Sequence, residues 1–191
     1  MNKQEKQDAI EKKFKSIMEI LGLDLDDDSL QDTPRRVAKM YVHELFSGLD
    51  TNNYPKITTQ LNKFGYDEML IETGIEINSV CEHHFVPIIG KCHIAYIPGK
   101  KVIGLSKLNR IAHYYAARPQ VQEKLTQQIK DDLVEALGVE NVAVVIDAAH
   151  MCVKMRGIKD SDCITRTSAL GGFFRSDISC RTEFFNSLPR L

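Results

Sequence analysis

Residues 141–149, NVAVVIDAA, form an almost entirely apolar run, which sets the strongest limit on the possible folds of this chain. A strand that is apolar on both faces has to be covered on both faces, so it belongs inside a packed domain. The residue patterns predict two further strands, at about 68–80 and 88–97. A turn at 98–100 leads from the second of these to a short strand at 101–104. The main domain is therefore expected to form around a sheet.

Two amphipathic helices are expected before the first of these strands. Apolar residues at helical spacing predict one helix over about 5–21. For the second helix, Thr33 is a suitable N-cap, Pro34 fits the first helical position, and Gly48 follows the last apolar residue. Residues 51–66 are polar with scattered Asn, Pro and Gly, so we interpret them as a connection.

A helix pair is expected ahead of the apolar strand. Ser106 can cap its first helix, Pro119 can open its second, and Gly138 can end the second. The resulting order of elements predicts an α+β fold, with helices on one face of a largely antiparallel sheet. We divide the chain into an N-terminal helical arm at 1–66 and a main domain at 67–191, which belong to one structural unit.

The charge and cysteine content narrow the possible partners and compartments. Lys and Arg number 25 against 26 Asp and Glu, so the formal charge of -1 gives no global attraction to nucleic acid or to a membrane. The chain contains no apolar run near the length of a membrane helix, and its first residues, MNKQEKQDAIEKK, lack the apolar core of a signal peptide. We therefore expect a cytoplasmic protein. Its five cysteines then indicate metal binding or buried thiols rather than a disulfide framework.

The sequence CEHH predicts a metal site. Cys81 and His84 lie three residues apart, and Cys152 could supply a third ligand, leaving one position open for water as in catalytic zinc sites. If Cys152 lies on a strand, His150 two residues earlier points to the same face. His83 adjoins the first two ligands in sequence, so two histidines would flank the metal and could transfer protons near neutral pH.

The same spacing is compatible with two other interpretations. Cys92 or His93 could complete a closed, structural zinc site, or the cysteines could simply be buried without a metal. Cys92 alternates with apolar residues along its strand, so we expect it to be a small residue of the core. Cys163 and Cys180 have no histidine neighbours, and we interpret them in the same way.

Basic residues in the second half of the chain predict an anion site. Lys107 and Arg110 lie three apart near the start of the helix capped by Ser106, where free N–H groups favour phosphate. A solvated basic face is the more frequent explanation of such a pair. Arg156 follows Cys152 by four residues, so it should lie near the metal.

Three other polar residues have no local signature. Arg36 lies on the arm helix among other basic residues. Gln122 and Glu123 begin the helix that follows Pro119, where an acidic residue is favoured in any case. By themselves these three residues predict no function; they support one only together with the other candidate site residues.

Taken together, the segments that contain these candidate site residues resemble GTP cyclohydrolase I, a zinc-dependent family. The resemblance is carried by the motifs CEHH, SKLNR, PQVQE and HMCVKxRG, where x is Met155 in this chain, and they occur in the order and at the spacing of the family. It runs from about residue 25 to the C-terminus. It implies the T-fold, an antiparallel sheet with two helices on one face, after the N-terminal helical arm. It also implies stacked rings that form a homodecamer with active sites at subunit junctions.

The resemblance further implies an activity and a cofactor. GTP would be the substrate and Zn²⁺ the cofactor, and the products would be formate and 7,8-dihydroneopterin triphosphate. This is the first step of folate or tetrahydrobiopterin biosynthesis. No nucleic acid and no membrane is expected as a partner.

Roles for individual residues follow from the resemblance. The zinc ligands would be Cys81, His84 and Cys152. The acid/base histidines would be His83 and His150, and Ser106 would assist the later rearrangement near the ribose. The triphosphate clamp would comprise Lys107, Arg110 and Arg156, with Arg36 supplied by a neighbouring subunit. The guanine edge would be held by Glu123, helped by Gln122.

Two rival functions use the same residues differently. A non-catalytic T-fold module that binds a purine or pterin would have a structural zinc and a fourth protein ligand. A related enzyme acting on a pterin or deazapurine would need no triphosphate clamp, which Lys107, Arg110 and Arg156 argue against. The chain departs from the family pattern at residues without an assigned role: Cys92, Lys124, Met155, Lys159 and Cys163.

Overall fold

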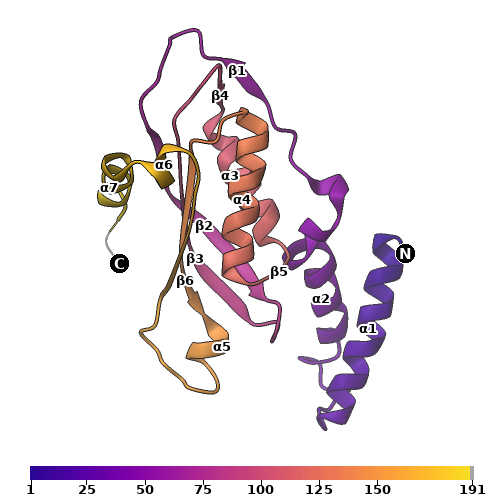
Figure 1. Ribbon diagram of the computed structural model, residues 1–191. Helices are drawn as coiled ribbons and strands as arrows, with labels where there is room; N and C mark the ends of the chain where they lie inside the picture. The colour runs from indigo at the N-terminus through magenta and orange to yellow at the C-terminus, as the bar shows by residue number, and fades with distance from the viewer. Residues whose placement is uncertain (190–191) are drawn as a thin grey trace.

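A five-stranded sheet in the order β5-β2-β3-β6-β7 organises residues 1–189, which this computed structural model describes (Figure 1). Its strands are β2 (Leu70–Cys81), β3 (Pro87–Tyr96), β5 (Pro119–Gln120), β6 (Val142–His150) and β7 (Thr165–Leu170). Neighbouring strands pair antiparallel, except that β5 runs parallel to β2. Together with its helices, the sheet gives the α+β class that the order of elements predicted.

The strand β6 is covered on both faces, as its composition predicted. On one face, Val144 and Ile146 lie in the core formed with α3 (Leu105–Ala116) and α4 (Gln122–Leu137). These are the two helices expected on one face, and they lie side by side in Figure 1. On the other face, Val145 packs into a second core. That core contains residues of α7 (Ile178–Asn186) and of the short α6 (Phe173–Ser176).

The two helices expected near the N-terminus are present. The first, α1 (Lys3–Ile20), packs against α2 (Thr33–Met40), and both stand beside the sheet in Figure 1. The prediction that Thr33 caps the second helix is wrong by one residue, since Asp32 occupies the cap and Thr33 already has helical geometry. The helix continues as a π-helical turn, η1 (Tyr41–Leu45). Among the described residues, no helix is long and apolar enough to span a bilayer.

The connection expected at 51–66 is more structured than its composition suggested. It follows the 3-10 turn η2 (Ser47–Leu49), begins with a second such turn, η3 (Thr51–Asn53), and contains the strand β1 (Thr59–Leu61). The strand expected at 101–104 is present as β4 (Lys101–Ile103), and it pairs antiparallel with β1. A polar strand of three residues carries little periodic signal, so its pairing partner decides its conformation.

The starts of both central helices also differ from the prediction. Gly104 occupies the cap of α3, and Ser106 lies within its first turn rather than at the cap. Pro119 belongs to β5 rather than to α4, because β5 pairs with the end of β2. The helix α4 therefore begins beside Cys81, and it ends as expected at Gly138, whose φ of 68° is left-handed.

Two glycines allow a test of the β3–β6 pairing. A Cβ atom on Gly90 would lie 2.0 Å from the carbonyl oxygen of Asp147 and 2.6 Å from the Cα of Ala148. Both contacts are with backbone, so Gly90→Ala should push β3 and β6 apart and destabilise the protein by about 1–3 kcal/mol or more. Gly138→Ala meets open space, and its left-handed φ should cost only about 1–2 kcal/mol.

Chemical denaturation of the two variants and the parent protein, at one protein concentration, measures the difference. We expect Gly90→Ala to have the lower midpoint and also to disturb the site, because the same pairing places Ile88 opposite His150. Equal midpoints for Gly90→Ala and the parent would contradict the close approach of the strands.

Candidate active site and metal centre

Cys81, His84 and Cys152 converge at one end of the sheet. One ligand atom from each lies within 4.8 Å of the others, which makes them the candidate metal group of the described residues. The antiparallel order β2-β3-β6 causes this convergence, because β2 ends at Cys81 and β6 ends at His150 on the same edge. The short helix α5 (Met151–Lys154), which carries Cys152, lies at that edge in Figure 1.

The geometry of Cys152 corrects one step of the sequence argument. We expected His150 and Cys152 to share the face of one strand, but β6 stops at His150 and Cys152 lies on α5. The change from strand to helix turns the Cys152 thiol toward Cys81 and His84, while His150 contacts α4 instead. The three candidate ligands thus come from two chain segments, as expected, but for a different geometric reason.

Cys152 lies in surroundings that disfavour its ionised form as long as no cation is bound. Burial raises the pKa of Cys152, and the neighbouring Cys81 thiol raises it further. Two thiolates and an imidazole are ligands that suit zinc, and a cation between the sulfurs would reverse this effect and stabilise both thiolates. The residues present therefore fit a zinc ion with one position left for a ligand other than protein.

The other cysteines and His93 lie outside the group. Cys92 is fully buried in the core, as predicted, and burial raises the pKa of its thiol. Because His93 contacts Asp147 instead, the closed site completed by Cys92 or His93 does not fit this structure. Cys180 packs against the second core, as expected, but Cys163 is exposed, so its interpretation as a core residue is wrong.

The turn that carries His83 and His84 is anchored to the arm. It is closed by hydrogen bonds between Cys81 and Val86 and between Phe85 and Cys81, each 2.9 Å long. Phe85 adopts a φ of 54°, an unfavourable value for a bulky residue. Its ring packs 5.2 Å from that of Phe46, and this contact holds the strained turn in place.

His83 and Arg156 both lie beside the metal group, as the sequence predicted. The Nδ1 atom of His83 is 4.0 Å from the Cys81 sulfur, and His83 itself is exposed. Arg156 approaches His84, with 3.1 Å between Nη1 and Nε2. A second link comes from α4, where Lys124 pairs with Glu82 of the turn and holds the pKa of that carboxyl below its usual value.

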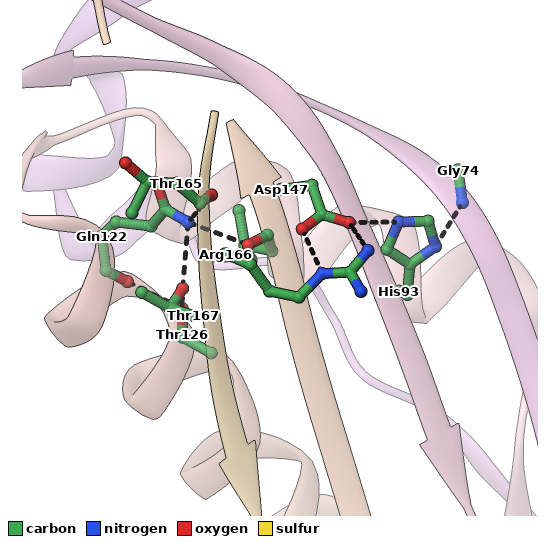
Figure 2. Close-up of polar contacts among 9 residues, drawn as sticks. Gly74, His93, Gln122, Thr126, Asp147, Thr165, Arg166 and Thr167 are labelled. Carbon is green, nitrogen blue, oxygen red and sulfur yellow. Dashed lines mark hydrogen bonds and ion pairs between the residues drawn. The ribbon is translucent and has the colours of Figure 1, made fainter. Parts of the chain in front are cut away.

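Gln122 is buried, with 1% of its surface exposed, and its side chain is occupied by partners inside the protein. Its Nε2 donates to main-chain and hydroxyl oxygens on β6 and β7, as Figure 2 shows. Its Oε1 lies 2.7 Å from Nε2 of His150. The expectation that this side chain helps to hold a guanine edge is therefore not supported, whereas Glu123 beside it is exposed. Burial lowers the pKa of His150, and the Glu123 charge partly opposes this.

The predicted anion-binding residues of α3 lie far from the metal group within the chain. Asn109, in the same helix, bonds to Glu72 near the start of β2, whereas Cys81 ends that strand nine residues later. At about 3.3 Å per residue, the two ends are roughly 25 to 30 Å apart. Lys107 bonds to the Lys56 carbonyl oxygen, and Arg110 faces a hollow next to the arm.

Ser106 lies at the same end of α3, and the ion pair of Arg36 in the described residues is within its own segment. Ser106 is exposed in the first turn of α3, beside Lys107. Arg36 lies on α2, where its guanidinium is 3.6 Å from the Asp32 carboxylate and its side chain is 67% exposed. One copy of the chain thus gathers the candidate ligands, the two histidines, Glu123 and Arg156, but not these other residues.

Comparisons with known proteins decide the family. The family model described as GTP cyclohydrolase I matches residues 10–189 of this chain. The chain belongs to the GTP cyclohydrolase I family. A GTP cyclohydrolase 1 of Aeromonas salmonicida (strain A449) is 54% identical over 188 residues, covering 98% of this chain and 86% of the relative. That of Tolumonas auensis is 55% identical over 186 residues, covering 97% and 86%. The family resemblance deduced from the four motifs is confirmed.

One polar cluster of this GTP cyclohydrolase I family member was missed by the sequence argument. Asp147 lies in β6 on the face opposite Ile146, and its carboxylate accepts bonds of 2.6 and 2.7 Å from Arg166. His93 lies 3.6 Å from the same carboxylate (Figure 2). An acidic residue inside an apolar strand was the signal, because a buried charge requires partners.

The tautomer of His93 follows from its neighbours. The backbone N–H of Gly74 donates to Nδ1 at 3.3 Å, so the proton of the neutral ring lies on Nε2, which faces Asp147. Burial lowers the pKa of His93 although Asp147 opposes this. The folded protein therefore holds His93 neutral at a pH where the unfolded chain already binds a proton.

This shift predicts a pH dependence of stability. A histidine whose pKa is lowered by folding contributes stability above its unfolded pKa of about 6.5, and this contribution is lost as the pH falls. In His93→Gln, the amide can still donate to Asp147 and accept from Gly74 without titrating. The free energy of unfolding should thus fall less between pH 7.5 and 5.5 in His93→Gln than in the parent, by at most about 1.4 kcal/mol per pH unit.

Denaturation at pH 7.5, 6.5 and 5.5 provides the comparison. His150 titrates in both proteins, so the difference between the two slopes is the relevant quantity. Parallel stability curves would show that His93 does not carry the predicted proton linkage.

Proposed function

We propose that this chain is a GTP cyclohydrolase that hydrolyses the imidazole ring of GTP, releasing formate and forming 7,8-dihydroneopterin triphosphate. The observation that carries the proposal is the group of Cys81, His84 and Cys152 beside His150 in a member of this family. The relatives named GTP cyclohydrolase 1 support it. The reaction would begin folate or tetrahydrobiopterin biosynthesis.

The cofactor in this proposal is Zn²⁺, held by the two cysteines and His84. Their donor set matches the ligands that zinc prefers, and three protein ligands are typical of catalytic sites. When bound, zinc would lower the pKa of a coordinated water toward about 7. The family's T-fold is the corresponding architecture, with α3 and α4 as the two helices on one face of the sheet.

The proton transfers are assigned to His83 and His150. Ring opening requires water to add at C8 of the purine and a proton to reach N7, and hydrolysis of the resulting formamide releases formate. A histidine has a pKa suited to both transfers near neutral pH. Ser106 would assist the later rearrangement of the ribose, which gives a 2-keto sugar that closes onto the free amine.

Glu123 is proposed to select guanine. The N1–H and 2-amino groups of guanine are neighbouring donors, and a carboxylate offers two acceptor oxygens. Adenine lacks this pair, so ATP would leave the carboxylate without its partners. Glu123 is exposed next to the buried Gln122, and its neighbour Lys124 pairs with Glu82 of the metal turn, so the carboxylate is close to the proposed zinc ligands.

The triphosphate clamp is proposed to be shared between subunits. Lys107 and Arg110 flank Asn109, which bonds to Glu72, and Glu72 lies roughly 25 to 30 Å along β2 from Cys81 by the spacing of strand residues. We infer that the two basic residues serve the metal group of a neighbouring copy, together with that copy's own Arg156, and that Arg36 comes from another neighbour. A homodecamer of stacked rings would provide such junctions. Residues 1–66 would act as the assembling arm and residues 67–191 as the catalytic domain.

Replacement of a zinc ligand tests the cofactor. Cys81→Ser, His84→Ala and Cys152→Ser should each lose bound zinc and ring opening together, because each leaves an incomplete site. Cys163→Ser, which alters an exposed cysteine, is the matched control and should keep both. Zinc is measured by elemental analysis, and activity by formate and by the fluorescence of the oxidised pterin. A zinc-free Cys152→Ser protein with full activity would refute the assignment.

Coexpression of two inactive variants tests the shared site. A Lys107→Ala/Arg110→Ala chain keeps its metal group, and a Cys152→Ser chain keeps its clamp. In mixed oligomers, random pairing should restore about a quarter of parent activity per site, since a quarter of junctions combine two intact halves.

The control for this experiment pairs Cys152→Ser with His84→Ala, which damage the same half. That mixture should stay inactive. If the first mixture is equally inactive although mixed oligomers form, the clamp and the metal group are not contributed by different chains.

A further inference from the structure

The orientation of the Gln122 amide is fixed by its surroundings. Its side-chain nitrogen lies 2.8 Å from the carbonyl oxygen of Ile146, 2.9 Å from that of Thr165 and 3.1 Å from the hydroxyl of Thr167. Carbonyl oxygens only accept hydrogen bonds, so the NH₂ group has to face them. In the reverse orientation the amide oxygen would face the carbonyl oxygens of Ile146 and Thr165. Three acceptors would then meet without a hydrogen between them.

A pair of threonines reinforces this orientation. The Thr126 hydroxyl donates to the main-chain oxygen of Gln122 at 2.7 Å, so its oxygen accepts from the Thr167 hydroxyl at 2.6 Å. Thr167 lies 3.1 Å from the Gln122 amide nitrogen, whose two hydrogens are shared among this hydroxyl and the two carbonyl oxygens. The bonds form a closed ring in which each hydroxyl hydrogen has one direction, and Figure 2 shows these side chains between α4 and β7. Gln122 and Thr126 are each 1% exposed, so water does not compete for these bonds.

The amide oxygen then determines the state of His150. Only Oε1 of Gln122 remains to contact the ring, at 2.7 Å from Nε2. Because an amide oxygen cannot donate, Nε2 has to carry the hydrogen, and in a neutral ring the lone pair then resides on Nδ1. Within residues 1–189, the hydrogen bonds of His150 leave Nδ1 without a protein partner.

We propose that Gln122 is a positioning residue that holds His150 as the Nε2–H tautomer, so that His150 exchanges protons with substrate or water through Nδ1. The catalytic part of this inference rests on the proposed function, since it assumes that His150 transfers protons during ring opening. The structural part does not. It assigns the Gln122 side chain to His150 rather than to the guanine edge, although its neighbour Glu123 is proposed to read that edge.

Nitrogen-15 spectroscopy tests the tautomer without substrate. The zinc-loaded protein, labelled with ¹⁵N at its six histidines, is measured as the intact assembly by solid-state NMR, and His150→Gln identifies the His150 signals. We expect a protonated Nε2 and an unprotonated Nδ1 in the parent. In Gln122→Met, which keeps the volume but removes the acceptor, the His150 signals should shift toward the Nδ1–H form or a mixture. Thr126→Val is the control, because it breaks the hydroxyl ring but leaves the amide oxygen facing His150.

Steady-state kinetics with GTP separate positioning from base recognition. If Gln122 acts through His150, Gln122→Met should lower kcat by about 10- to 100-fold, as expected for loss of a supporting contact, with KM within about threefold. If its side chain binds guanine instead, KM should rise while kcat changes little. Gln122→Glu, with a protonated carboxyl that keeps one donor and one acceptor, should restore both the Nε2–H pattern and part of kcat.

The outcomes distinguish this inference from the proposed function. An inactive parent protein would refute the proposed function, and the spectra would still test the tautomer. An Nδ1–H ring in the parent, or an unchanged His150 pattern in folded Gln122→Met, would overturn the positioning role. If Gln122→Met fails to fold, Gln122→Glu decides, because a loss of the Nε2–H pattern in a folded Gln122→Glu protein would equally contradict it.

Discussion

The antiparallel pairing of β3 with β2 on one side and β6 on the other is the constraint on which the candidate site depends. It places the last residues of β2 and β6 on the same edge, with Ile88 opposite His150 and Val80 opposite Pro87. Ligands that are separated by about seventy residues in the sequence thereby come within reach of one metal ion. Parallel strands would have put these two ends on the same edge only with long crossover connections. The two-residue strand β5 pairs with the end of β2, and it thereby places the start of α4 beside that edge.

Burial on both faces of β6 explains why its neighbourhood contains two closed polar networks. On one face Gln122 joins α4 to β6 and β7, and on the other Asp147 joins β6 to Arg166 and His93. A buried polar group without partners would cost about 1–3 kcal/mol, and among the described residues none of the buried side-chain atoms that lack a hydrogen-bond partner belongs to these two networks. Such networks have one low-energy arrangement. The strand that leads to His150 is thus held in register from both sides, which gives the ring a defined orientation.

In our proposal, the distance between the metal group and the basic residues of α3 explains why the active site needs more than one subunit. A rigid strand separates the two groups within a chain, so no side-chain movement can bring them together. A substrate that needs both has to be bound where two chains meet. The helical arm contributes in a second way, since the aromatic contact from Phe46 to Phe85 supports the turn that carries His83 and His84.

Residue patterns were sufficient to predict the α+β class, the main helices and strands, the candidate zinc ligands and the family. Apolar periodicity, the glycine that ends α4 and the CEHH spacing are local signals. The apolar faces that the periodicity predicted are the ones that pack in the core. Three features became known only from the folded chain: the pairing of β1 with β4, the assignment of Pro119 to β5 and the helical position of Cys152. The folded chain also shows that Gln122 faces His150 and that Lys107 lies far from Cys81. The physical reason is the same in each case: short polar segments and buried hydrogen bonds take their conformation from partners that are distant in the sequence, and no local pattern specifies those partners.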